Sequence, residues 1–161
     1  MKRRLPLAER PPMIANQYMA FPLSIIFTEP ERYEPWFYNE FTQLYSIVQA
    51  NHEMQIIMYL SNDNNGYQPL QHFELSFKDF LIHEDIVLFF KMLINNGYYV
   101  KTFANVGLLS ALHLERDFIH DILINGFDDE SKTFYFRSYR NGHLQECAVR
   151  MRNWHKPIYR V

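Results

Sequence analysis

The sequence predicts an α+β fold in which helices pack on an antiparallel β-meander. Three observations support this prediction: apolar residues at helical spacing before position 95, three strand-like segments that follow one another after residue 119, and the hairpin-forming pair Asn141-Gly142. The chain has 161 residues, of which 48% are hydrophobic and 21% are charged. It is therefore long enough for one domain with a sizeable core, and its 17% of aromatic residues supply rings for both core and surface.

The first half of the chain is expected to alternate strands with one helix. Met19–Phe27 is apolar and ends in β-branched residues, which favours a buried strand. Pro35 fits the first turn of a helix, and apolar residues then recur at helical spacing as far as Val48. Gln55–Leu60 is a second short apolar run and is predicted to be a strand.

The second half is expected to contain one helix and then the meander. Acidic residues in the first turn and an Asn-Asn-Gly end predict a helix over His83–Ile94. Turn-forming residues separate the apolar runs that follow, so each run is predicted to be a strand of an antiparallel sheet. These strands are Tyr98–Phe103, His120–Phe127, Thr133–Tyr139 and Leu144–Met151.

The termini, the charge and the single cysteine bear on location and organisation. Residues 1–14 are basic and rich in proline, which predicts an N-terminal arm before a single domain over residues 15–161. No signal peptide or membrane-spanning run is expected, because no apolar stretch is long enough. Cys147 has no partner for a disulfide within the chain, so we expect a cytoplasmic protein.

One stretch of the meander carries a family resemblance. In His120-Asp121-Ile122-Leu123-Ile124-Asn125-Gly126-Phe127-Asp128-Asp129, a histidine opens a strand that ends in a Gly-aromatic-Asp turn, and the ring-rich Thr133–Phe136 returns beside it. This pattern resembles the histidine hairpin of papain-like cysteine peptidases, in the branch of bacteriocin-leader peptidases and butirosin-type acyltransferases. Asn95–Val100 and Pro35–Tyr38 resemble the junction before that hairpin and a helix start in related bacterial proteins. The resemblance implies a papain-like fold.

Papain-like catalysis needs a cysteine nucleophile, a histidine base and an orienting carboxylate or amide. His120 matches the histidine. The nucleophile belongs within residues 16–36, where there is no cysteine and Ser24 is a candidate hydroxyl. The orienting residue belongs near Ser138, which can accept a hydrogen bond but carries no charge. The resemblance therefore implies a domain that has lost its nucleophile.

The function expected from this resemblance is a non-catalytic accessory or binding protein in bacterial peptide or secondary-metabolite biosynthesis. Its partner is expected to be a carrier or synthetase protein, or a peptide held in a cleft. Two alternatives remain open: an acyltransferase, cyclase or hydrolase with His120 as general base, and a structural subunit of a homo-oligomer. The residues expected to line the cleft are Trp36, Phe37, Tyr99, Asp121 and Tyr139.

Other kinds of site have little support in the sequence. The seven histidines show no recognised metal spacing, and the five glycines form no phosphate-binding loop. We therefore expect no metal and no cofactor. The net charge of −2 offers no overall attraction for nucleic acid or for an anionic membrane, and neither is an expected partner.

Overall fold

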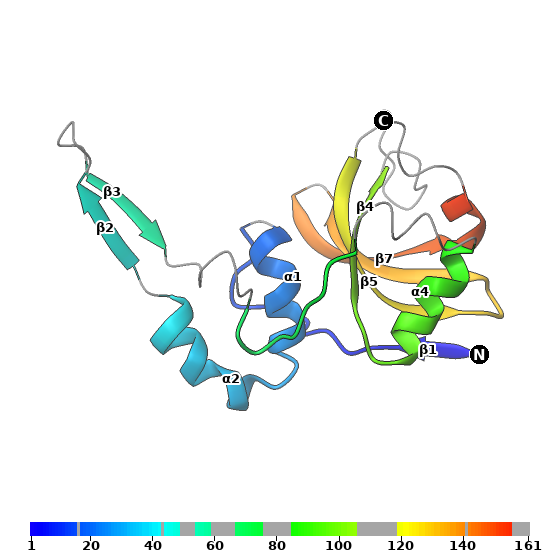
Figure 1. The fold of residues 1–161 in the computed structure, drawn as a ribbon, viewed down its shortest axis with the longest axis horizontal. Coiled ribbons are helices and arrows are strands. Elements are labelled where there is room, and N and C mark those ends of the chain that lie inside the picture. The colour runs from blue at the N-terminus through cyan, green and yellow to red at the C-terminus, as the bar shows by residue number, and fades with distance from the viewer. Residues whose placement is uncertain are drawn as a thin grey trace.

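An antiparallel sheet of five strands forms the main body of the computed structural model; two helices lie beside it, and a third helix and a two-stranded hairpin extend away from it (Figure 1). The predicted combination of helices with an antiparallel sheet is therefore confirmed at the level of an α+β fold. The structure describes residues 1–15, 17–42, 44–48, 54–58, 67–75, 85–105, 119–140 and 142–155.

Strand β5 (Ile119–Asp128) organises the sheet. On one side it pairs with β6 (Thr133–Arg140), which in turn pairs with β7 (His143–Arg150). On the other side, β4 (Val100–Asn105) covers its first half and β1 (Lys2–Arg4) covers its last residues. Two strands from distant parts of the sequence thus share one edge of β5.

The strands predicted after residue 119 are confirmed, with small shifts of their ends. The turn between β6 and β7 contains Gly142, whose φ of 76° is the left-handed conformation that favours glycine. Its predicted partner Asn141 lies outside the described residues. From the sequence, residues 105–118 are expected to be a loop. Asn105 is instead the last residue of β4, and positions 106–118 lie outside the described residues.

The segment expected as an N-terminal arm is part of the sheet. Lys2 pairs with Asp128 and Arg4 with Gly126. Leu5 follows this strand and is only 6% exposed, within the main hydrophobic core. The basic and proline-rich composition suggested a free arm, but strand pairing and one buried leucine fix the segment instead.

Met19–Phe27 is a helix and not the predicted strand: α1 spans Gln17–Ile26. The prediction was wrong because it relied on the apolar and β-branched composition, which a buried helix shares. Pro22 lies inside this helix and removes the hydrogen bond to the carbonyl of Tyr18. The Tyr67 hydroxyl donates to that carbonyl instead, at 2.8 Å. A tyrosine distant in sequence thus satisfies the backbone group that the proline leaves unpaired.

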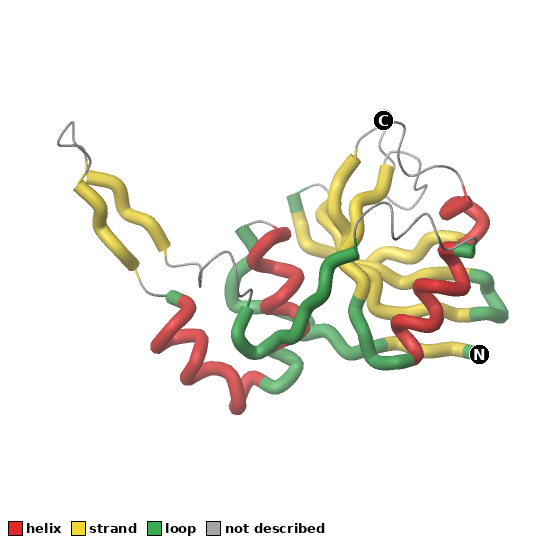
Figure 2. The backbone as a smooth tube through the Cα atoms, in the orientation of Figure 1, coloured by secondary structure: helices red, strands yellow, loops and turns green. Residues whose placement is uncertain are grey.

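The predicted helix from Pro35 to Val48 is also corrected. Helix α2 begins earlier, with Pro30 in its first turn, and spans Pro30–Trp36; a π-helical turn, η1, continues it over Phe37–Phe41. The remaining residues form β2 (Leu44–Val48), which pairs with β3 (Met54–Met58). β3 confirms the predicted second strand for its described residues. Figure 2 shows this hairpin apart from the five-stranded sheet.

Helix α4 spans Ile86–Asn95, close to the predicted range, of which positions 83 and 84 lie outside the described residues. Asp85 caps it by accepting a hydrogen bond from the backbone of Leu88 at 3.0 Å. Phe90 and Ile94 face the sheet and are almost completely buried. None of the helices in the described residues is long and apolar enough to cross a membrane.

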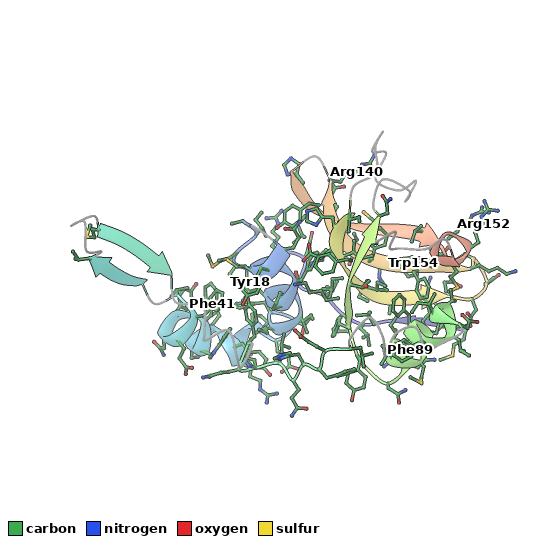
Figure 3. The ribbon with its side chains drawn as sticks, turned by 45° about the horizontal axis from the view of Figure 1, so that its top comes forward. Tyr18, Phe41, Phe89, Arg140, Arg152 and Trp154 are labelled. Atoms are coloured by element: carbon green, nitrogen blue, oxygen red, sulfur yellow. The ribbon has the colours of Figure 1, made fainter. Side chains whose placement is uncertain are left out.

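Three rings close the core between α4 and the sheet. Phe90 contacts Phe134 of β6 edge-on at 6.1 Å between ring centroids. Trp154, in the 3-10 turn η3 (Met151–His155) and labelled in Figure 3, contacts both of these rings at 5.7 Å, again edge-on. This geometry is favourable for aromatic pairs beyond the area they bury.

Replacing Phe90 with alanine should lower the free energy of unfolding by about 3–5 kcal/mol, because it leaves a cavity among these rings. Leu88 is on the same helix but is 61% exposed. Leu88→Ala is therefore the matched control and should change stability by less than about 0.5 kcal/mol. Urea unfolding followed by circular dichroism measures both values, and similar losses in the two variants would contradict the assignment of the buried face.

Candidate functional site

His120 lies near the start of β5 and is engaged by two other side chains. Its Nδ1 is 2.8 Å from Oδ1 of Asp121, and the amide nitrogen of Gln17 lies 2.9 Å from Nδ1 and also contacts Nε2. A carboxylate only accepts hydrogen bonds, so we assign the neutral tautomer in which Nδ1 donates to Asp121 and Nε2 accepts from Gln17. The lone pair that a general base needs is thus occupied by an amide of the protein itself.

Asp121 also forms an ion pair across the β4–β5 ladder. Its Oδ2 lies 3.4 Å from Nζ of Lys101, and that ammonium group is 5.8 Å from the centroid of the Tyr18 ring, which is labelled in Figure 3. The carboxylate therefore joins an imidazole to an ammonium group where α1, β4 and β5 meet. This arrangement fixes the position and tautomer of His120.

Sequence reasoning found two members of this group and missed the other two. It selected His120 and Asp121 but not Gln17 or Lys101. Lys101 pairs with Leu123 and Phe103 pairs with Asp121, so lysine and aspartate lie diagonally on one face of the ladder. That relation could have been found by aligning the two predicted strands. Gln17 offered no such signal, because its helix was predicted as a strand.

Ser24, the candidate nucleophile, is completely buried on α1. Its hydroxyl donates to the carbonyl of Ala20 at 2.5 Å and accepts from Nη1 of Arg137 at 2.9 Å. The single hydroxyl proton is therefore directed at the helix backbone. The Ser24 hydroxyl thus accepts a hydrogen bond from the buried guanidinium of Arg137 and stabilises that charge.

Arg137 of β6 is a buried cation that sequence reasoning missed. Besides Ser24 it donates to the carbonyl of Ala8 at 2.6 Å, and its Nη2 lies 3.7 Å from Oε1 of Glu146. Burial lowers the pKa of Arg137, Glu146 opposes this shift, and the neighbouring Arg4 adds to it. The guanidinium joins α1, the N-terminal segment and β7.

Ser138 and the two tyrosines expected to line the cleft, Tyr99 and Tyr139, lie in different surroundings. Ser138 is buried on β6, next to Arg137 in sequence and on the opposite face of the strand. The hydroxyl of Tyr139 donates to the carbonyl of Ile14, and that of Tyr99 donates to the carbonyl of Pro6, both at 2.5 Å. The two tyrosines thus hold the N-terminal segment.

Trp36 and Phe37 belong to a separate aromatic cluster formed by α1, α2, η1 and Tyr67. Phe37 stacks on Phe41 with 5.4 Å between centroids, and Phe41 stacks on Tyr67 at 5.5 Å. Trp36 packs on Phe41 at 5.5 Å. These rings form a core of their own, distinct from the main core against which Tyr99 packs.

Cys147 is half-buried on β7, where it pairs with Phe136 and packs against the main core. Burial raises the pKa of its thiol, Glu146 raises it further, and Arg140 opposes them. A thiol in this setting is mostly protonated at neutral pH and is a poor nucleophile. Among the described residues, no three His, Cys, Asp or Glu side chains are grouped closely enough to hold a metal ion.

Comparisons of the chain with protein-family models, with curated proteins and with solved structures find no match.

Cys147 should react slowly with iodoacetamide at neutral pH, and its rate should rise as the pH approaches and passes the ordinary thiol value of 9.0. It is the only cysteine, so mass spectrometry reports this one site. The same chain unfolded in urea is the control and should react faster at every pH below that value. Fast labelling at neutral pH that does not depend on pH would show an activated thiol instead.

Tyr99→Phe should lower the free energy of unfolding by about 1 kcal/mol at neutral pH, because the hydrogen bond to Pro6 is lost. Burial raises the pKa of Tyr99 from 10.0 to about 12. Its contribution is therefore complete below pH 10.0 and is lost as the pH rises through about 12. The wild type should lose more stability than the variant across this range.

Tyr98→Phe is the matched control, since Tyr98 is an exposed neighbour of Tyr99. It should leave the alkaline loss of stability unchanged. Urea unfolding at neutral pH and across the alkaline range measures the effect. If the wild type and Tyr99→Phe lost equal free energies of unfolding at alkaline pH, ionisation of Tyr99 would not be linked to stability.

Proposed function

We propose that this chain is a non-catalytic accessory or binding protein, related to papain-like domains and lacking their nucleophile. By the resemblance of its histidine hairpin, its setting is bacterial peptide or secondary-metabolite biosynthesis in the cytoplasm. Its partner is a carrier or synthetase protein, or a peptide. The observation that carries the proposal is the engagement of both His120 ring nitrogens by Gln17 and Asp121.

The state of His120 favours a structural role over proton transfer. A general base must present a free lone pair within hydrogen-bond reach of the proton that it removes. Here the amide of Gln17 lies on Nε2, and Asp121 is shared with Lys101. The group ties the start of α1 to the sheet, so it supports the fold on which a partner would bind.

The candidate nucleophiles agree with this reading. Ser24 is turned toward the carbonyl of Ala20 and receives a hydrogen bond from Arg137. Activation of a serine requires a base that accepts its proton, and the two partners of Ser24 are a backbone carbonyl and a cation. Cys147 has a raised pKa, the opposite of an activated thiol.

Hydrolysis of two reactive acyl probes, a p-nitrophenyl ester and an N-acetylcysteamine thioester, tests the non-catalytic proposal. We expect His120→Ala to hydrolyse both at the wild-type rate within about twofold, since the chemistry does not pass through this ring. His143→Ala changes an exposed histidine on β7 and is the matched control. A loss of tenfold or more in His120→Ala alone, in a variant with unchanged circular dichroism, would establish an enzyme instead.

A further inference from the structure

The first eight residues bind to the rest of the chain mainly through backbone hydrogen bonds, as an extended peptide binds to a receptor. Residues 2–4 add a strand to β5. The backbone of Leu5 then makes two hydrogen bonds to Asn125: its N–H donates to the backbone carbonyl at 2.7 Å, and its carbonyl accepts from Nδ2 at 3.0 Å. The segment is thus recognised largely through its main chain, which is how strand addition binds peptides.

Side chains and backbone from several elements continue this recognition beyond the strand. The Tyr99 hydroxyl donates to the carbonyl of Pro6. Ala8 donates its N–H to the carbonyl of Ser24 at 2.7 Å and accepts from Arg137 at 2.6 Å. Groups from α1, from the residue before β4, and from β5 and β6 therefore converge on the backbone of residues 5–8, and we refer to this set of groups as the peptide groove.

Asn125 sets where this groove begins. The register between β5 and β6 shifts between Ile124 and Gly126, so Asn125 is a bulge residue without a partner on β6. It lies beyond Ile124, which pairs with the first residue of β4. β4 leaves the β5 edge uncovered from Asn125 onward. The side chain of Asn125 binds the backbone of Leu5 at this point. Gly126 follows, where an added Cβ would lie 2.8 Å from the carbonyl oxygen of Arg3.

Three side chains of residues 1–8 also contact the rest of the protein. Leu5 is buried in the main core cluster and acts as an apolar anchor. Lys2 lies 3.8 Å from the carboxylate of Asp128. Arg4 forms an ion pair with Glu146 and lies over the ring of Tyr135, with 4.8 Å from Cζ to the centroid. The groove thus matches two cationic residues on one face of a strand, followed by an apolar residue.

We propose that this groove is a binding site for an extended peptide and that residues 1–8 are its tethered occupant. The ligand is a segment of a partner protein with cationic residues two positions apart, followed by leucine and proline, and it binds by displacing the tethered strand. This proposal rests on the proposed binding function and specifies the chemistry of the partner.

Cleavage of the full chain provides the test. A protease site is inserted after Glu9, at an exposed bend, so that cleavage leaves residues 1–9 held without a covalent bond. A fluorescein-labelled peptide with the sequence of residues 1–9 is then added, and its binding is followed by anisotropy. The cleaved protein should take up this peptide at least tenfold more tightly than the uncleaved protein, in which the tethered segment competes.

The peptide's own residues supply the specificity controls. A peptide with Lys2→Glu and Arg4→Glu should bind at least tenfold more weakly, and one with Leu5→Asp should not bind measurably. On the protein, Glu146→Gln should weaken uptake several-fold, whereas Glu130→Gln, which changes an exposed turn residue, should leave it unchanged. Circular dichroism verifies that each protein variant is folded.

Several outcomes would overturn the proposal. Equal uptake of a scrambled peptide would do so, as would a cleaved protein that stays folded but never exchanges its segment. If cleavage abolished the circular dichroism signal and added peptide did not restore it, residues 1–9 would be an integral part of the fold and not a displaceable ligand. Exchange of the segment between uncleaved copies to give dimers would assign the groove to a second copy of this chain. Acyl-probe turnover is measured separately, so failure of the groove proposal and failure of the non-catalytic proposal remain distinguishable.

Discussion

The buried guanidinium of Arg137 constrains much of the structure around it. A charge removed from water must be surrounded by partners, because an unpaired one costs several kcal/mol. Here the partners come from three separate parts of the chain: Ser24 on α1, Ala8 in the N-terminal segment and Glu146 on β7. Each of these three residues contacts the guanidinium group. Helix α1, the chain segment that follows β1, and strand β7 are therefore linked through this one side chain.

This coupling explains why the residues chosen for catalysis do not form a catalytic group. Ser24 serves Arg137, while His120 serves the junction of α1 with β4 and β5. Tyr99 and Tyr139 hold backbone carbonyls, and Trp36 is part of a separate aromatic core. The same residue types that suggested a cleft instead fix the N-terminal segment and α1 to the sheet.

The sequence predicted the meander and α4 because their signals are local. Alternating apolar residues, an Asp85 cap and Gly142 in a tight turn each act within a few residues. Helix α1 could not be predicted in this way: Pro22 argues against a helix, and the hydroxyl that compensates for it comes from Tyr67. Gln17 and Arg137 were missed for the same reason, since their partners are distant in sequence and become neighbours only in the fold.

The edge of β5 that β1 and β4 share bears on association between chains. A strand edge with unpaired amide and carbonyl groups is a template for pairing between chains, and natural proteins cover such edges. Strand β1 covers the end of β5 that β4 does not reach. Whenever β1 leaves, those groups are exposed beside the apolar site vacated by Leu5. Pairing of this exposed edge with a second chain would then compete with the return of β1, so the strand that completes the sheet also protects it from association between chains.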